Sequence, residues 1–167
     1  MNRVVSPPTT IPRIPRGHLV NFQGGRGILH VMAENLPRRV LVVDDEPLIR
    51  WSIAETLKAH GYTVLEAESG AGALRTLQLS ARPVDAVVLD YRLPDTNNLS
   101  LLARIRQSAP GIPVIVITAF GTPELVQDAR CLGAYDVMDK PFEMNHLEGV
   151  VSRACELAID PPSAGPV

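Results

Sequence analysis

Five side chains that could move a phosphoryl group stand at the ends of short apolar segments in this 167-residue sequence. Asp44 and Asp45 follow VLVV, Asp90 follows VDAVVL, Thr118 follows IPVIVI, and Lys140 comes shortly after the last such segment. Clustered carboxylates repel one another unless a cation shares them, and oxygen ligands with room for water suit Mg²⁺. A carboxylate nucleophile, a divalent metal, a hydroxyl donor and an ammonium group together suit the transfer of a phosphoryl group onto an aspartate.

Alternating segments of two kinds are expected to position these side chains. Runs of Val, Ile and Leu predict strands at 40–43, 62–67, 84–89, 112–117 and 134–138, and helical spacing predicts helices at 47–60, 70–80, 98–108, 123–132 and 143–157. This alternation predicts a doubly wound (βα)5 α/β fold, whose parallel sheet is covered by helices on both faces. With the flavodoxin-like strand order 2-1-3-4-5, the strands ending at Asp44 and at Asp90 are neighbours, and ligands bind at that edge.

Proline and charge divide the chain into three parts. Residues 1–38 carry a net charge of +4, residues 39–158 a net of −5 and residues 159–167 a net of −1, within a total of −2. We therefore expect a disordered Pro/Arg-rich segment at 1–38, one folded domain at 39–158 and a disordered Pro-rich tail at 159–167. Met32 opens MAENLPRRVLVVDDEP directly before the first predicted strand. We hypothesise that residues 1–31 are not native, which the intact mass of the protein from its source would test.

The composition argues against several classes of protein. The chain has no run of about 18 apolar residues that would predict a membrane span, and its N-terminus lacks the apolar region of a secretory signal. Cys131 and Cys155 match no zinc or CxxC spacing and are expected to be free thiols. The charge is too acidic for a dedicated nucleic-acid binder, and neither GxxxxGK[ST] nor GxGxxG is present. We expect a cytoplasmic protein with no direct nucleic-acid or membrane contact.

Four segments, VLVVDDEPLIR, VVLDYRLPDTNNL, VIVITAFG and GAYDVMDKPF, carry a resemblance to a known family. Residues 39–158 resemble the receiver domain of two-component response regulators. The resemblance implies that Asp90 is the phosphoacceptor. It also implies that Mg²⁺ is bound directly by Asp45, by Asp90 and by the backbone carbonyl of Arg92, with Asp44 acting through a water molecule.

The same resemblance implies a mechanism and two kinds of partner. Thr118 would bind a phosphoryl oxygen, Lys140 would pair with the phosphoryl group, and Pro141 would follow a cis peptide bond. A histidine kinase or a histidine phosphotransfer protein would supply the phosphoryl group, and a downstream protein would read the 123–157 face. The domain would not be an enzyme with a separate substrate, since it catalyses only its own phosphotransfer and autodephosphorylation.

Four positions bear on how such a domain would switch. Val137 stands where the family commonly has Tyr or Phe. Tyr135, two residues earlier, is expected on the same strand face, where it would either substitute for that aromatic side chain or, as we favour, serve as a packing residue. Phe120 is expected near the phosphoryl position, where its bulk would slow the attack of water, or else to lie on the surface. Asn98 replaces a common Gly and tolerates a positive φ.

Three alternatives to a phosphorylated stand-alone receiver stay open. The chain could be a phosphorylation-independent interaction module, or a fragment of a longer transcription regulator. It could also be a metal-dependent phosphohydrolase, although such enzymes typically carry an Asp two residues after the nucleophile, where this chain has Arg92. With a small phosphodonor and Mg²⁺, a long-lived adduct at Asp90 indicates a receiver, no adduct an interaction module, and rapid turnover a hydrolase.

Overall fold

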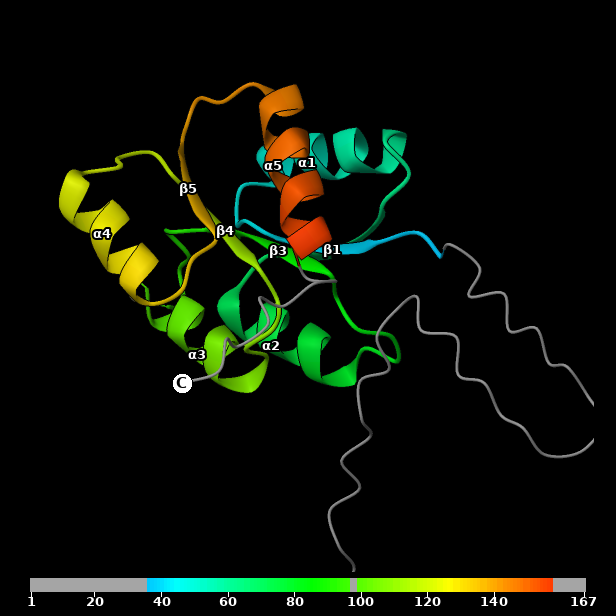
Figure 1. Ribbon diagram of the computed structural model, residues 1–167, viewed down its shortest axis with the longest axis horizontal. Coiled ribbons are helices and arrows are strands. Elements are labelled where there is room, and N and C mark those ends of the chain that lie inside the picture. The colour runs from blue at the N-terminus through cyan, green and yellow to red at the C-terminus, as the bar shows by residue number, and fades with distance from the viewer. Residues whose placement is uncertain (1–35, 97–98, 158–167) are drawn as a thin grey trace, which may run out of the picture. The chain divides into compact units, whose positions relative to one another are not determined.

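A five-stranded parallel sheet forms the centre of the computed structural model, which describes residues 36–96 and 99–157. The strands are β1 (Arg39–Val43), β2 (Thr63–Ala67), β3 (Ala86–Asp90), β4 (Val114–Thr118) and β5 (Asp136–Asp139). Their order in the sheet is β2-β1-β3-β4-β5, and every neighbouring pair is parallel (Figure 1). This order confirms the predicted doubly wound α/β fold.

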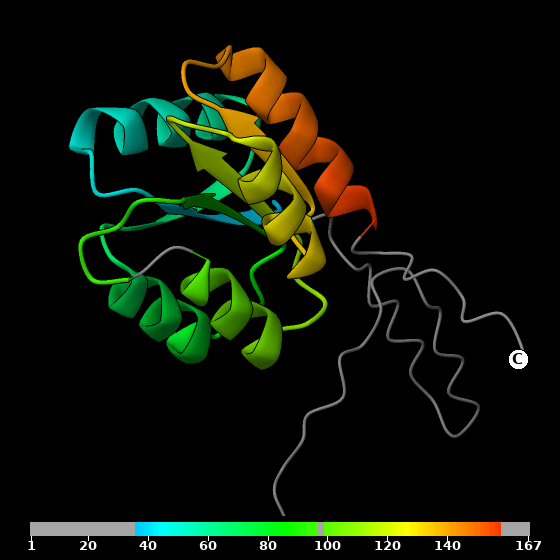
Figure 2. The same cartoon turned by 90° about the vertical axis from the view of Figure 1, so that its left-hand side faces the viewer.

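Within residues 36–96 and 99–157, five helices cover the sheet on its two faces. They are α1 (Pro47–Ala59), α2 (Gly70–Leu79), α3 (Ser100–Ser108), α4 (Pro123–Cys131) and α5 (Met144–Leu157). Figure 2 shows the sheet between helical layers, with α1 and α5 on one side. Alternate strand residues pack into two separate cores, since Val40 and Val42 face α1 and α5, whereas Leu41 and Val43 face α2, α3 and α4. All these elements lie within the unit Pro37–Val167.

Local sequence signals set most helix ends. Pro47 occupies the first turn of α1, where its missing N–H costs no hydrogen bond. Gly61 and Gly133 follow α1 and α4 with φ values of 85° and 87°, which glycine adopts more readily than other residues. The side chains of Ser69 and Thr122 accept backbone N–H groups at the starts of α2 and α4.

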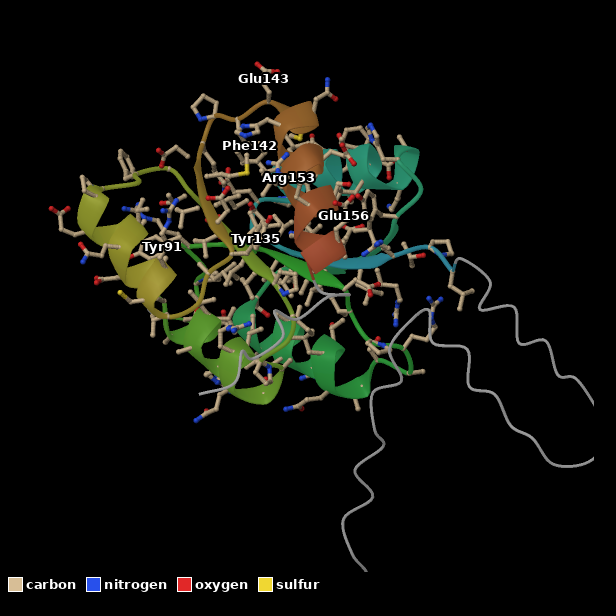
Figure 3. The ribbon with its side chains drawn as sticks, in the orientation of Figure 1. Tyr91, Tyr135, Phe142, Glu143, Arg153 and Glu156 are labelled. Atoms are coloured by element: carbon tan, nitrogen blue, oxygen red, sulfur yellow. The ribbon has the colours of Figure 1, made fainter. Side chains whose placement is uncertain are left out.

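The side chain of Leu48, in the first turn of α1, is 80% exposed. One prediction about a shared strand face is wrong. Tyr135, which Figure 3 labels, packs against the core beside α1 and α5. Val137 packs against the other core, so the two side chains do not share a face. The strict alternation of faces holds only within a strand, and Tyr135 precedes β5. Substitution of the aromatic switch by Tyr135 therefore loses its geometric basis, whereas the alternative prediction that Tyr135 is a packing residue is confirmed.

Several predictions concern parts of the chain that the structure does not describe. The segments predicted at 1–38 and 159–167 lie outside the described residues, apart from 36–38, and so does Asn98. None of the helices within the described ranges has the length and hydropathy needed to cross a bilayer.

Candidate metal and phosphoacceptor site

The carboxyl ends of β1, β3 and β4 bring the predicted site residues to one edge of the sheet. Val43 of β1 is in register with Leu89 of β3, so Asp44, directly after β1, and Asp90, the last residue of β3, lie at the same level. Carboxylate oxygens of Asp44, Asp45 and Asp90 lie within 4.8 Å of one another. The predicted acidic cluster is therefore formed by the fold.

Burial distinguishes the members of this cluster. Asp44 has no exposed surface, Asp90 is 6% exposed and Thr118 is 2% exposed, whereas Asp45 is exposed. Within the described residues, these first three are the buried side chains that carry polar or charged groups. Burying a carboxylate is unfavourable unless it is paired or hydrogen-bonded, so the sheet edge must supply partners for Asp44 and Asp90.

Lys140 supplies the main partner. Its Nζ lies 2.9 Å from Oδ2 of Asp90, 3.0 Å from Oδ2 of Asp44 and 3.4 Å from Oε1 of Glu46. Burial acts to lower the pKa of Lys140, but hydrogen bonds to Asp90 and Asp44 outweigh it and the pKa is raised. Lys140 therefore remains an ammonium ion that offsets two buried carboxylates. The Lys140–Pro141 peptide bond is cis, as the family resemblance predicted.

Backbone groups complete the surroundings of the two buried carboxylates. Oδ1 of Asp44 accepts the backbone N–H of Glu46 at 2.8 Å, and the guanidinium of Arg50 donates to the carbonyl oxygen of Asp44 at 2.6 Å. Oδ1 of Asp90 accepts the backbone N–H of Arg92 at 3.2 Å. Burial nevertheless raises the pKa of Asp44, because desolvation exceeds the opposing hydrogen bonds to Lys140 and Glu46.

Thr118 is held beside this cluster through its backbone and its hydroxyl. The backbone N–H of Lys140 donates to the carbonyl oxygen of Thr118 at 2.6 Å, and the Thr118 hydroxyl accepts the backbone N–H of Phe120 at 3.2 Å. Phe120 is 68% exposed. The guanidinium of Arg92 lies over its ring, with 5.3 Å between the guanidinium carbon and the ring centroid. Phe120 therefore lies on the surface, and the same contact joins it to the loop after Asp90.

Two roles at the site were missed by reasoning from the sequence. Glu46 is the third carboxylate near Lys140, and its only sequence signal is its place directly after the acidic pair. Glu66 of β2, to which no role was assigned, lies 3.6 Å from Arg50 and 3.7 Å from Lys58. Arg50 therefore connects Glu66 with the backbone of Asp44.

The donor set fits a small hard cation. The converging groups are carboxylates, and the described cluster contains no thiolate or imidazole. One carboxylate is exposed and two are buried beside a single ammonium ion, so the negative charge is offset only in part. Such an oxygen site with an open side suits Mg²⁺, which keeps several of its own waters.

Comparison with known proteins relates this chain to response regulators. The family model described as the response regulator receiver domain matches residues 40–152. The chain is 42% identical over 120 residues to an NtrX-like response regulator of Rickettsia conorii, covering 71% of this chain and 25% of that protein. It is 36% identical over 115 residues to the DNA-binding transcriptional regulator NtrC of Escherichia coli, covering 69% of this chain and 24% of that protein.

Solved structures agree with the sequence relatives. The receiver domain of NtrX from Brucella abortus matches with a TM-score of 0.65 and 35% identity, covering 70% of this chain and 98% of that one. A receiver domain from Clostridium thermocellum matches with a TM-score of 0.67 and 28% identity, covering 71% and 94%. The chain spans about a quarter of the length of the curated relatives it matches. It belongs to the response regulator receiver domain family.

Proposed function

We propose that Asp90 accepts a phosphoryl group from a histidine kinase or a histidine phosphotransfer protein, in a Mg²⁺-dependent two-component relay in the cytoplasm. The observation that carries this proposal is the ammonium group of Lys140, 2.9 Å from Asp90 and 3.0 Å from Asp44 at adjacent strand ends. Receiver domains are signalling domains that bind Mg²⁺ at an acidic pocket, and the cluster of Asp44, Asp45 and Asp90 in this chain supports the same role.

The chain's own groups have distinct roles in the transfer. An oxygen of Asp90 attacks the phosphorus of a phosphohistidine, so that a P–O bond forms, the P–N bond breaks and the imidazole leaves with the electron pair. Lys140 pairs with the phosphoryl oxygens and the Thr118 hydroxyl donates to one of them. Asp45, Asp90 and the Arg92 carbonyl would hold Mg²⁺, with Asp44 acting through water. The bound ion would offset the charge on the transferring oxygens.

The resulting acyl phosphate would alter the face formed by α4, β5 and α5. When Thr118 turns its hydroxyl to the phosphoryl group, it gives up its contact with the backbone N–H of Phe120, and the 118–122 loop moves with it. Within α4 only Ala129 is a fully buried side chain, so this helix is lightly packed. We propose that a downstream protein reads the 123–157 face, and that the domain makes no direct nucleic-acid contact.

A direct phosphorylation assay tests the function. Incubation with a small phosphodonor and Mg²⁺ should give a long-lived phosphoryl adduct, visible in the intact mass and located at Asp90 by peptide mapping. Chelation of Mg²⁺ with EDTA should prevent the adduct. An unmodified chain in excess donor and Mg²⁺ would instead indicate an interaction module, and rapid release of phosphate would indicate a hydrolase.

The lifetime of the adduct should depend on Phe120. We expect Phe120→Ala to lose its phosphoryl group several-fold faster than the wild type. Phe120 lies two residues after Thr118 and its ring contacts the guanidinium of Arg92, two residues after Asp90, so the two side chains would hinder the approach of water to the acyl phosphate. The decay of the adduct, followed by intact mass after donor removal, measures this. Leu132→Ala, at another exposed apolar side chain, should decay at the wild-type rate. An unchanged lifetime of the Phe120 variant would reject the shielding role.

A protein donor should also need the exposed start of α1. Leu48 is 80% exposed and Trp51 is 60% exposed; they are three residues apart on one helix face, and Leu48 is three residues after Asp45. We expect Leu48→Asp to slow transfer from a phosphorylated histidine kinase while leaving transfer from a small phosphodonor unchanged. Leu79→Asp, equally exposed on α2, is the matched control. If Leu48→Asp slowed phosphotransfer equally from the kinase and from the small phosphodonor, Leu48 would support the phosphoacceptor site rather than contact with the kinase.

A further inference from the structure

The loop that follows the phosphoacceptor is fastened at its far end to the beginning of α2. Oδ1 of Asp95 accepts the backbone N–H of Gly70 at 2.8 Å, and Oδ2 accepts the backbone N–H of Ala71 at 2.9 Å. Both donors belong to the first turn of a helix, where N–H groups have no partner within the helix. The bonds from Ala71 and Gly70 lower the pKa of Asp95, which keeps the carboxylate charged at neutral pH.

Close packing strengthens the same junction. Gly70 is buried, and a Cβ placed on it would lie 2.3 Å from Cγ2 of Thr96 and 3.2 Å from Cδ2 of Leu101. A larger residue at the start of α2 would force the Thr96 side chain, or the loop that carries it, to shift. The 91–96 loop and α2 therefore meet through two hydrogen bonds and a contact that only glycine permits.

Further contacts hold this loop nearer to the site. The backbone N–H of Tyr91 donates to the carbonyl oxygen of Ile117 at 2.8 Å, and Leu93 is 7% exposed within the core beside α2 and α3. The backbone N–H of Thr96 lies 3.5 Å from the carbonyl oxygen of Leu93, closing a turn before the junction with α2. Arg92 lies between these fixed points.

We propose that Asp95 is a positioning residue for the magnesium site: by binding the start of α2 it fixes the 91–96 loop, and with it the backbone carbonyl of Arg92. This inference rests on the function proposed above, in which that carbonyl binds the metal. Asp95 contacts neither metal nor phosphoryl group and acts through the loop backbone. Partners that orient metal ligands in this way typically change metal affinity by about 10- to 100-fold when they are removed.

A pair of variants separates this role from simple support of α2. Asp95→Ala removes the two hydrogen bonds from the loop, whereas Ser69→Ala removes the bond that the Ser69 hydroxyl accepts from Gly72 at 3.1 Å. Both variants lose a cap of the same helix, and we expect both to lower the urea midpoint. In calorimetric titration of the full chain with MgCl₂, Asp95→Ala should bind about tenfold more weakly than the wild type, and Ser69→Ala should bind as the wild type does.

Two further measurements make the outcome decisive. Without metal, the amides of residues 91–93 should exchange faster in Asp95→Ala than in Ser69→Ala, since only the first variant frees the loop. Gly70→Ala, which forces Thr96 of the loop to shift while keeping Asp95, should also weaken Mg²⁺ binding. Equal Mg²⁺ affinity of Asp95→Ala and Ser69→Ala would overturn the positioning role. The wild-type adduct tests the proposed function separately, so a normal adduct with equal affinities would reject only this inference.

Discussion

Asp90→Asn should give no phosphoryl adduct with either a small phosphodonor or a phosphorylated kinase. The amide oxygen of asparagine is a far weaker nucleophile than a carboxylate, and an amide cannot form the acyl phosphate. The two Oδ atoms of Asp90 have separate contacts, one with Lys140 at 2.9 Å and one with the Arg92 N–H at 3.2 Å. Asparagine retains the size of the side chain, so the fold should persist and the loss should be chemical.

The adduct is measured by intact mass, with the circular dichroism spectrum as the check on folding. Asp128→Asn, at an exposed carboxylate of α4, should be phosphorylated at the wild-type rate. Asp45→Asn should keep the phosphoacceptor but require more Mg²⁺, because its carboxylate is one of the three that converge on the cation position. A full adduct on the Asp90 variant would assign the chemistry to another carboxylate.

Lys140→Met should weaken both the fold and the phosphotransfer. Without the ammonium ion, Asp44 and Asp90 are left as buried carboxylates close to each other with no compensating charge. Removing one partner of a buried ion pair lowers the free energy of unfolding by about 3 to 5 kcal/mol. Because the Lys140 side chain is 13% exposed, we expect a loss near the lower end of that range. Mg²⁺ should restore part of this stability, because it offsets the same two carboxylates.

The pH dependence of that loss has a definite sign. The pKa of Lys140 is raised above its ordinary value of 10.5 in the folded state, so its contribution is fully present below about pH 10.5. The contribution disappears as the pH rises through the higher folded-state pKa. In urea unfolding without metal, the difference in free energy of unfolding between the wild type and Lys140→Met should be constant around neutrality and shrink above pH 10.5.

The other lysine of the chain provides the control. Lys58 lies on the exposed part of α1, 3.0 Å from Glu55, and its side chain is 45% exposed. Exposed pairs of this kind contribute less than about 1 kcal/mol, so Lys58→Met should change stability little. If Lys58→Met were as destabilising as Lys140→Met, the stabilisation would not arise from the buried site.

The alternation of apolar strands and amphipathic helices is strong enough to predict the order of elements and the edge at which the site lies. Asp44, Asp90, Thr118 and Lys140 each sit at or near a strand end, so the fold class alone brings them close together. Residues that act across long separations have no such signal. Asp95 binds amides 24 and 25 residues away, and no local pattern distinguishes it from an ordinary turn aspartate. The exposure of Leu48 likewise depends on what packs against α1 rather than on helical periodicity.

Lys140 joins parts of the chain that are distant in sequence, and this bears on the order of folding. It contacts Asp44, 96 residues earlier, and Asp90, 50 residues earlier. Contacts between such distant residues form late, because a long loop must be closed before they contribute. A nascent chain that ends before β5 would have the acidic residues but not the ammonium ion. The ability to accept a phosphoryl group would therefore arise only once the last strand has docked, so that unfinished chains would not compete with complete ones for the kinase.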